Sequence, residues 1–317
     1  MQEKIIKGEA PKEEIIKIFE LFDEKGMTDE ELAGIVDVTR ENMNRVEIDF
    51  DCLDTCGTGG DKLNTFNIST VSAIVCAAAG VPVAKHGNRA ASSKCGSADV
   101  LEKLGVKIEL DSKQAKRCLE DTGIVFMFAP LFHPALKFVK DARTEYGKKT
   151  YFNILGPMLN PAMAKYQVIG VADITKANLI GKTLLQTGSE RAMIVQGDEG
   201  LDEISIEKDT QIIDFNKKRN EAENYKINPL QLGLDIYPLA EIKGGESEEN
   251  ARIFLNILKN EATLPQLNAV LLNAAAGLLA FGKVKDFSEG VELAYEIIKS
   301  GKALKKLEEF IEVSNKL

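Results

Sequence analysis

The first 48 residues carry apolar positions at helical spacing and contain no strand-like pattern. One apolar face runs over residues 15–22, and Thr28 with Glu31 has the spacing of a capping box that begins a second helix. Two short helices bury little apolar surface alone. We therefore expect residues 1–48 to form a small helical lobe that packs on later segments or on a second copy of the chain.

From residue 50 onward, short apolar runs alternate with helical patterns. This alternation is typical of βαβ units around a parallel sheet. Several helices are expected to end at glycines, which readily take the left-handed conformation that closes a helix, at Gly80, Gly105, Gly123 and Gly188. The expected strands span residues 52–55, 82–85, 124–128, 166–171, 191–195 and 211–215.

The C-terminal region returns to a helical pattern, in which three consecutive alanines at residues 274–276 permit close helix packing. The predicted fold class is therefore α/β. It combines the small helical N-terminal lobe with a large α/β domain over residues 49–317, which has a mostly parallel central sheet and C-terminal helices.

Charge narrows the classes of function. The chain has 317 residues, and its 40 Lys+Arg against 49 Asp+Glu give a formal net charge of −9. Affinity for nucleic-acid backbones and anionic membranes comes mainly from basic surfaces. We therefore expect no nucleic-acid partner and no membrane partner, and an anionic ligand would have to be held by cations concentrated in one place.

The cysteines and the apolar runs indicate the compartment. The five cysteines are scattered and form no CxxC pair, which favours free thiols in a reducing compartment over a disulfide framework or a zinc ribbon. The N-terminal residues are charged rather than signal-like, and the most apolar runs, residues 71–84 and 269–281, fall short of the ~20 residues of a membrane-spanning helix. We expect a cytoplasmic protein.

A glycine-rich turn follows the first expected strand. It runs from Asp54 to Asp61 and leads into residues 67–70 at the start of a helix. Glycines let backbone N–H groups approach anionic oxygens, and Ser69 and Thr70 could cap a helix whose N-terminus favours negative charge. The turn is neither a Walker A loop nor a complete dinucleotide fingerprint. Taken alone, it is explained equally well as a tight strand-to-helix turn.

A second loop, residues 85–97, is dense in polar chemistry. It brings Lys85, Arg89 and Lys94 together with a histidine and several hydroxyls, directly after an expected buried strand. Ligand sites of α/β proteins lie at this end of the strands. Lys85 and Arg89 could neutralise phosphates, while serine hydroxyls and backbone N–H groups supply neutral hydrogen bonds.

Two further candidates are ambiguous from the residues alone. Asp202 and Glu203 are adjacent acids in a loop after an expected strand, and such pairs are usually only solvated. Arg143 lies on a helix that we expect to begin at Pro134, and its periodicity favours an exposed face. A ligand-binding role for these residues needs support from elsewhere.

Four motifs occur together in this chain: residues 57–61, residues 67–70, residues 85–89 with Ser92 and Ser93, and residues 152–157 with Asn160 and Pro161. In combination they resemble the anthranilate phosphoribosyltransferase family. The resemblance runs from about residue 7 to the C-terminus and implies a glycosyltransferase of tryptophan biosynthesis. Such an enzyme joins the amine of anthranilate to C1 of 5-phosphoribosyl 1-diphosphate (PRPP), with Mg²⁺ as the cofactor.

The resemblance implies a role for individual residues. Anthranilate would contact Gly57, Asn88 and Arg143, and Mg²⁺ would be bound by Ser69, Asp202 and Glu203. The residues expected around PRPP are Gly57, Gly60, Asp61, Thr65, Asn67, Ile68, Ser69, Thr70, Lys85, His86, Gly87, Asn88, Arg89, Ala90, Ala91, Ser92, Ser93 and Ser97.

Both histidines, His86 and His133, fall in matching motifs, and we give them pocket roles without assigning an acid or a base. An aniline-type amine is already neutral at physiological pH, so a strong base is not required. Catalysis would depend mainly on positioning the amine and on stabilising the departing diphosphate.

The sequence also departs from the family pattern. Cys95 stands where a serine is expected, and Lys148 and Lys149 precede Thr150 where many relatives have an arginine before the threonine. A lysine keeps the positive charge but cannot bind an anion in the bidentate geometry of arginine. The helical lobe is also short, although the resemblance implies that residues of about 131–149 join it and that it forms a homodimer interface.

Two alternatives remain at this stage. A pyrimidine nucleoside phosphorylase-like enzyme would share the architecture, but the loop at residues 85–89 and the acidic pair favour the transferase. A catalytically silent relative that binds nucleic acid would need a basic groove, which the acidic composition does not favour.

Overall fold

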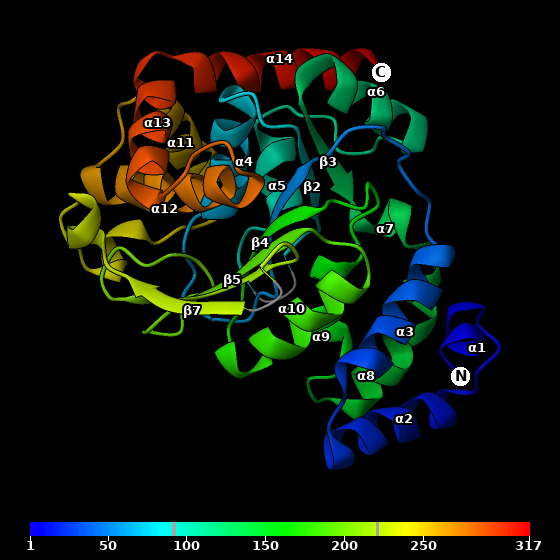
Figure 1. Ribbon diagram of the computed structural model, residues 1–317. Helices are drawn as coiled ribbons and strands as arrows, with labels where there is room; N and C mark the ends of the chain where they lie inside the picture. The colour runs from blue at the N-terminus through cyan, green and yellow to red at the C-terminus, as the bar shows by residue number, and fades with distance from the viewer. Residues whose placement is uncertain (91–92, 220–221) are drawn as a thin grey trace.

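A seven-stranded sheet forms the centre of the molecule in the computed structural model, which describes residues 1–90, 93–219 and 222–317 (Figure 1). The strand order is β3-β2-β1-β4-β5-β6-β7. The first five strands in this order are parallel, and the last two pair antiparallel, which confirms the predicted α/β class with a mostly parallel sheet. The strands are β1 (Leu53–Gly57), β2 (Val83–Gly87), β3 (Ile124–Phe128), β4 (Tyr166–Gly170), β5 (Arg191–Gly197), β6 (Thr210–Asn216) and β7 (Ala222–Ile227).

The edge strand β7 has no counterpart among the expected strands, although all six expected strands are present. Along β7 only Ile227 is buried, and the other residues are exposed or half-buried. An exposed edge strand needs no apolar run, so it leaves little hydrophobic signal in the sequence.

Helices cover both faces of the sheet. Helices α4 and α12 pack on one face, and α10 packs on the other against β5 and β6. The α-helices are α1 (Gln2–Ile6), α2 (Lys12–Lys25), α3 (Asp29–Glu41), α4 (Ile68–Ala78), α5 (Ser97–Lys103), α6 (Ser112–Thr122), α7 (Ala129–Phe132), α8 (Lys140–Tyr146), α9 (Phe152–Leu155), α10 (Ala177–Gln186), α11 (Ser247–Leu258), α12 (Leu264–Phe281), α13 (Phe287–Lys299) and α14 (Lys302–Lys316). Short 3₁₀ helices are η1 (Pro134–Val139), η2 (Gly156–Met158), η3 (Ile174–Lys176), η4 (Pro229–Leu232) and η5 (Leu239–Ile242).

The helix boundaries follow the predicted signals. The Glu31 N–H donates to Thr28 Oγ1 at 3.2 Å and the Thr28 N–H donates to Glu31 Oε2 at 3.1 Å, which confirms the capping box at α3. All four glycines expected to end helices have positive φ angles: Gly80, Gly105, Gly123 and Gly188. The short helix α1 was not expected.

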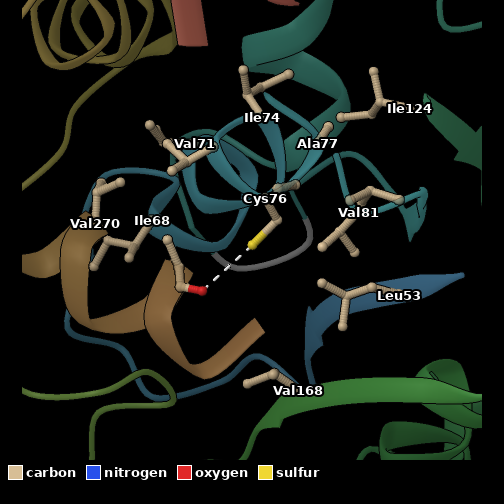
Figure 2. Packing of buried hydrophobic residues seen from close by; sticks show 14 of the residues in the cluster. Leu53, Ile68, Val71, Ile74, Cys76, Ala77, Val81, Ile124, Val168 and Val270 are labelled. Atoms are coloured by element: carbon tan, nitrogen blue, oxygen red, sulfur yellow. Dashed lines mark hydrogen bonds between the residues drawn. The ribbon is translucent and has the colours of Figure 1, made fainter. Parts of the chain in front are cut away.

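Helix α12 is the central core helix. It is the one helix in the described residues that is long and apolar enough to cross a membrane, but 83% of its residues are buried inside the protein. Gly277 on α12 allows close contact with α4, because a Cβ at this position would lie 2.8 Å from Cys76 Sγ. Figure 2 shows Cys76 in this contact, where its thiol donates to the Ala274 carbonyl at 3.5 Å. All five cysteines are free thiols, as expected.

The N-terminal helices pack on the middle of the chain. Helix α2 packs on α8, and α1 packs on α3 and η1. The Phe19 ring lies 5.4 Å from Tyr146 and 5.8 Å from Tyr151, measured between centroids. These helices lie at the opposite end of the molecule from α14 (Figure 1). The division into a lobe of residues 1–48 with about 131–149 and a domain of residues 49–317 remains a prediction.

A buried arginine joins α3 to the rest of the protein. Arg40 is 5% exposed; its Nε donates to the Met158 carbonyl at 2.8 Å and its Nη1 donates to the Thr187 carbonyl at 2.6 Å. Both acceptors lie far along the chain, so this one side chain fixes the end of α3 against η2 and the end of α10.

Candidate active site

Two cavities open where the parallel strands end. The first has a volume of about 930 Å³ and the second about 990 Å³. The loops that follow β1, β2 and β4 all contribute to the first cavity, because parallel strands place their carboxyl ends at the same edge of a sheet. Asn88, Lys149 and Asn153 line both cavities, so the two spaces adjoin there.

The structure brings most of the expected site residues, for PRPP and for the metal, into one cavity. Arg143 and His133 line the second cavity instead, while Asn88 is shared. Ala91 and Ser92 lie outside the described residues. Those found around the first cavity are Gly57, Gly60, Asp61, Thr65, Asn67, Ile68, Ser69, Thr70, Lys85, His86, Gly87, Asn88, Arg89, Ala90, Ser93, Ser97, Asp202 and Glu203.

The glycine-rich turn leaves the end of β1 in a conformation that glycine favours. Gly59 and Gly60 have φ angles of +64° and +89°. The Thr58 N–H donates to the Gly170 carbonyl at 2.8 Å, which ties the start of the turn to β4. The Leu63 N–H donates to Asp61 Oδ1 at 3.0 Å and fixes its end. The turn is therefore held at both ends.

The prediction that Ser69 and Thr70 cap the next helix is wrong. Helix α4 has Asn67 as its N-cap residue, and Ser69 and Thr70 lie inside its first turn. Asn67 makes no side-chain cap, because its Nδ2 donates to the Cys95 carbonyl at 3.1 Å and its Oδ1 accepts from Asn250. The Ser69 N–H instead donates to Glu203 Oε1 at 3.1 Å.

Lys85 and Arg89, two of the three cations of the second loop, face different partners. Lys85 is 4% exposed; its Nζ donates to the Thr55 carbonyl and lies 3.4 Å from Ser69 Oγ. Arg89 forms ion pairs with Asp99 at 3.0 Å and Glu102 at 2.8 Å. Lys85 is thus an internal counter-charge beside α4, whereas the guanidinium of Arg89 is bound to acids of α5.

Three acidic side chains gather at the glycine-rich turn: Asp61 belongs to the turn, and Asp202 and Glu203 lie opposite it. Asp202 packs over Gly57, because a Cβ added at Gly57 would lie 3.2 Å from Asp202 Oδ2. Burial, followed by the carboxylates of Asp61 and Glu203, raises the pKa of Asp202 well above its ordinary value. Burial raises the pKa of Glu203 to about 7, although Lys85 opposes this shift. The like charges repel one another, and a bound cation would relieve that repulsion.

The acidic cluster suits a cation that brings its other ligands with it. No group of three or more His, Cys, Asp and Glu side chains in the described ranges is placed to hold a metal ion by itself. Mg²⁺ commonly takes one or two carboxylates and completes its shell with waters and substrate phosphate oxygens. The donor chemistry of Asp202, Glu203 and the Ser69 hydroxyl fits that pattern.

The two histidines form a buried pair between the cavities, because His86 lines the first cavity and His133 lines the second. Their ring centroids lie 5.0 Å apart, and His86 and His133 are 8% and 4% exposed. Burial is the main cause that lowers the pKa of His86 to about 3 and that of His133 to about 4. Both imidazoles are therefore neutral at physiological pH.

Arg143 faces the second cavity as a half-buried cation. Its guanidinium lies over the Phe152 ring, 5.7 Å from the centroid. Burial lowers the pKa of Arg143, and no charged neighbour in the described part of the chain contributes to this shift. The exposed helix face favoured by periodicity alone is thus wrong, because η1 and α8 place Arg143 at the cavity wall beside His133.

Comparison with known proteins decides the family. The glycosyl transferase family, a/b domain, matches residues 49–304. The chain is 45% identical over all of its 317 residues to an anthranilate phosphoribosyltransferase of Dehalococcoides mccartyi, of which it covers 93%. The chain belongs to the anthranilate phosphoribosyltransferase family.

Solved members of the anthranilate phosphoribosyltransferase family have the same fold. The enzyme of Thermus thermophilus superimposes with a TM-score of 0.93 at 37% identity, covering 99% of this chain and 93% of that one. The enzyme of Saccharomyces cerevisiae in complex with PRPP and Mg superimposes with a TM-score of 0.83 at 30% identity, covering 92% and 81%. Family membership favours the transferase over both alternatives considered above.

Several cavity residues escaped the sequence reasoning. Lys149 was named from the sequence only as a departure from the family pattern, but it comes close to the glycine-rich turn, since a Cβ added at Gly60 would lie 4.0 Å from Lys149 Nζ. The signal for this segment was the neighbouring family motif at residues 152–157. Asp173 and its neighbours could have been found from their position directly after the strand β4, because the loops that follow parallel strands line the cavity. The missed residues of the first cavity include Tyr151, Asn153, Asp173, Thr175 and Lys176.

Proposed function

We propose that this protein transfers the 5-phosphoribosyl group of PRPP to the amine of anthranilate, a step of tryptophan biosynthesis. The products are N-(5-phosphoribosyl)anthranilate and diphosphate. One observation carries the proposal: a cavity that joins a glycine-rich turn, a helix N-terminus and a buried acidic cluster adjoins a second cavity with an arginine at its wall. The two cavities suit a phosphorylated donor and an aromatic acid acceptor.

The donor would bind across the first cavity. In the turn at residues 57–61, the backbone N–H groups that follow Thr58 could donate to phosphate oxygens, and the dipole at the N-terminus of α4 favours negative charge there. The Ser69 N–H would have to leave Glu203 Oε1 before it could donate to a phosphate. The loop at residues 85–97 supplies cations and hydroxyls from the opposite side. For Arg89 to bind a phosphate, its guanidinium would have to leave Asp99 and Glu102.

Asp202, Glu203 and the Ser69 hydroxyl would hold Mg²⁺ at the diphosphate. When bound, the ion supplies positive charge that stabilises the departing diphosphate. Lys85 complements it from within the protein, because its buried ammonium lies 3.4 Å from Ser69 Oγ. The solved yeast relative in complex with PRPP and Mg supports this choice of cofactor.

The acceptor would bind in the second cavity. The Arg143 guanidinium can donate to the anthranilate carboxylate, while Asn88 stands where the two cavities adjoin. The neutral histidines do not repel the cationic character that the ribose gains at C1. The aniline amine is neutral before it attacks, so the residues mainly orient it toward C1.

The setting of the enzyme is also part of the proposal. A homodimer through the helical lobe follows from the family resemblance, and a cytoplasmic location follows from the scattered free thiols. Sedimentation of the purified protein tests whether it is a dimer. We expect a species of twice the mass of the 34.7 kDa chain. A monomer at micromolar concentration would contradict it.

The test of function is the decay of anthranilate fluorescence after PRPP and Mg²⁺ are added to the purified protein. We expect decay with the wild-type protein. We expect little Mg²⁺-dependent turnover in the double variant Asp202→Asn, Glu203→Gln, which should remain folded because it removes repelling charges. No decay with the wild type beside an active control enzyme would refute the function, and unchanged Mg²⁺ dependence in the double variant would refute the metal assignment.

A further inference from the structure

Two asparagines from the C-terminal helices reach the loops of the first cavity. Asn250 is on α11 and Asn273 is on α12, and they are 2% and 3% exposed. Neither side chain lines either of the two cavities described above. A buried amide is costly unless its donors and acceptor are paired, so the partners of these two side chains show what each one holds in place.

Asn250 holds the segment that begins α4. Its Nδ2 donates to Asn67 Oδ1 at 2.9 Å, and its Oδ1 accepts from the Gly245 N–H at 2.7 Å. Asn67 then donates to the Cys95 carbonyl at 3.1 Å. This chain of amides connects α11, the segment that begins α4 and the loop at residues 85–97, three segments that are far apart in sequence.

The loop before α11 lies directly on the same segment. A Cβ at Gly244 would be 2.8 Å from Phe66 Cα, and Lys243 forms a β-bridge with Thr65. The Phe66 N–H also donates to the Ile242 carbonyl at 3.2 Å. Asn250 therefore stabilises a contact in which backbone meets backbone, with no room for another side chain.

Asn273 holds the acidic loop from the other side. Its Oδ1 accepts from the Ile204 N–H at 2.9 Å, and its Nδ2 donates to the Ile204 carbonyl at 3.3 Å and to the Ala269 carbonyl at 2.8 Å. Ile204 directly follows Glu203. The backbone of the same loop packs directly against β4, because a Cβ added at Gly170 would lie 1.6 Å from the Asp202 carbonyl oxygen.

We propose that Asn250 and Asn273 are positioning residues for the two halves of the donor site. Asn250 acts through Asn67 on the segment that receives PRPP, and Asn273 acts through Ile204 on the acids that receive the metal. The inference rests on the proposed function. It predicts a division of effects, because each amide contacts one loop and not the other.

The test compares Asn250→Leu and Asn273→Leu with the control Asn268→Leu. Leucine keeps the approximate volume but cannot form hydrogen bonds. Asn268 is also on α12 and buried at 6% exposure, and its side chain donates to the Asp235 carbonyl at 3.5 Å, away from both loops. Loss of a supporting contact typically weakens binding by about 10- to 100-fold.

For Asn250→Leu we expect the KM for PRPP at saturating Mg²⁺ to rise by roughly tenfold or more. For Asn273→Leu we expect the Mg²⁺ concentration that gives half the maximal rate to rise by a similar factor. Mn²⁺ binding in the presence of PRPP, followed by electron paramagnetic resonance, should weaken in Asn273→Leu. The KM for anthranilate should change less than about twofold in all three variants.

Urea denaturation shows whether each variant is folded. Where a leucine variant is not folded, the corresponding Asn→Ser variant is tested instead, because serine keeps a small polar group. Folded variants with wild-type dependence on PRPP and Mg²⁺, or with the same change in both constants as Asn268→Leu, would overturn the inference. A wild-type protein without activity would instead refute the proposed function. The two failures are therefore distinguishable.

Discussion

Gly170 offers a sharp test of the placement of the acidic loop. This glycine ends β4 and has no positive φ angle, so alanine meets no backbone strain there. Its Cβ, however, would lie 1.6 Å from the Asp202 carbonyl oxygen. We predict that Gly170→Ala displaces the acidic loop while β4 keeps its pairing with β1 and β5.

The size of the displacement follows from the contact. Real Cβ atoms essentially never lie closer than 3.0 Å to such an atom, so Asp202 must move by at least about 1.4 Å. A misplacement of ~1 Å in a catalytic arrangement can lower the rate by roughly 100-fold, which is about 2.7 kcal/mol of transition-state stabilisation. We therefore expect kcat/KM for PRPP at limiting Mg²⁺ to fall by about 100-fold.

The assay is the decay of anthranilate fluorescence over a series of Mg²⁺ concentrations, with urea denaturation to establish that the variant is folded. Gly34→Ala is the matched control, because Gly34 lies within α3 and a Cβ there meets nothing within 4 Å. We expect wild-type kinetics from the control. A folded Gly170→Ala protein with wild-type kcat/KM would refute the reasoning.

Three further variants test other parts of the structure. Arg143→Ala should raise the KM for anthranilate by about tenfold or more and leave the KM for PRPP unchanged; the reverse pattern in steady-state kinetics would contradict its role. Burial lowers the pKa of His133 from 6.5 to about 4, because the folded protein disfavours the charged imidazole. The unfolding free energy should therefore fall by on the order of 3 kcal/mol as the pH drops from about 6.5 to about 4. In His133→Gln, the unfolding free energy from urea denaturation should not show this fall. The same fall with pH in the variant as in the wild type would contradict the assignment to His133. Gly277→Ala should lower the unfolding free energy by about 1–3 kcal/mol, because its Cβ would lie 2.8 Å from Cys76 Sγ; a more stable variant would show that α4 and α12 have room.

The fold was predictable where burial leaves a pattern in the sequence. The expected strands and the glycines that end helices are present because apolar runs and left-handed turns are local features. Strand β7 was not predictable, since it lies at the sheet edge with mostly exposed residues. The N-cap of α4 was also missed, because Asn67 is held by Asn250 and Cys95 from distant segments.

The site was predictable as a set of loops but not as a set of contacts. The motifs after β1 and β2 do line one cavity. Nothing local indicates that Asp61 approaches Asp202, or that Arg89 pairs with Asp99 and Glu102. Asp61 meets Asp202 because β1 and β5 end at the same edge of the sheet, and Arg89 meets its acids because the loop after β2 folds back onto α5. Only the three-dimensional structure shows both contacts.

A crystal structure with PRPP and Mg²⁺ bound tests the central claim most directly. We predict that the diphosphate lies between the turn at residues 57–61 and the loop at residues 85–97. The metal should lie about 2.1 Å from a carboxylate oxygen of Asp202 or Glu203. A diphosphate bound outside the first cavity, or a metal that contacts neither carboxylate, would contradict the account.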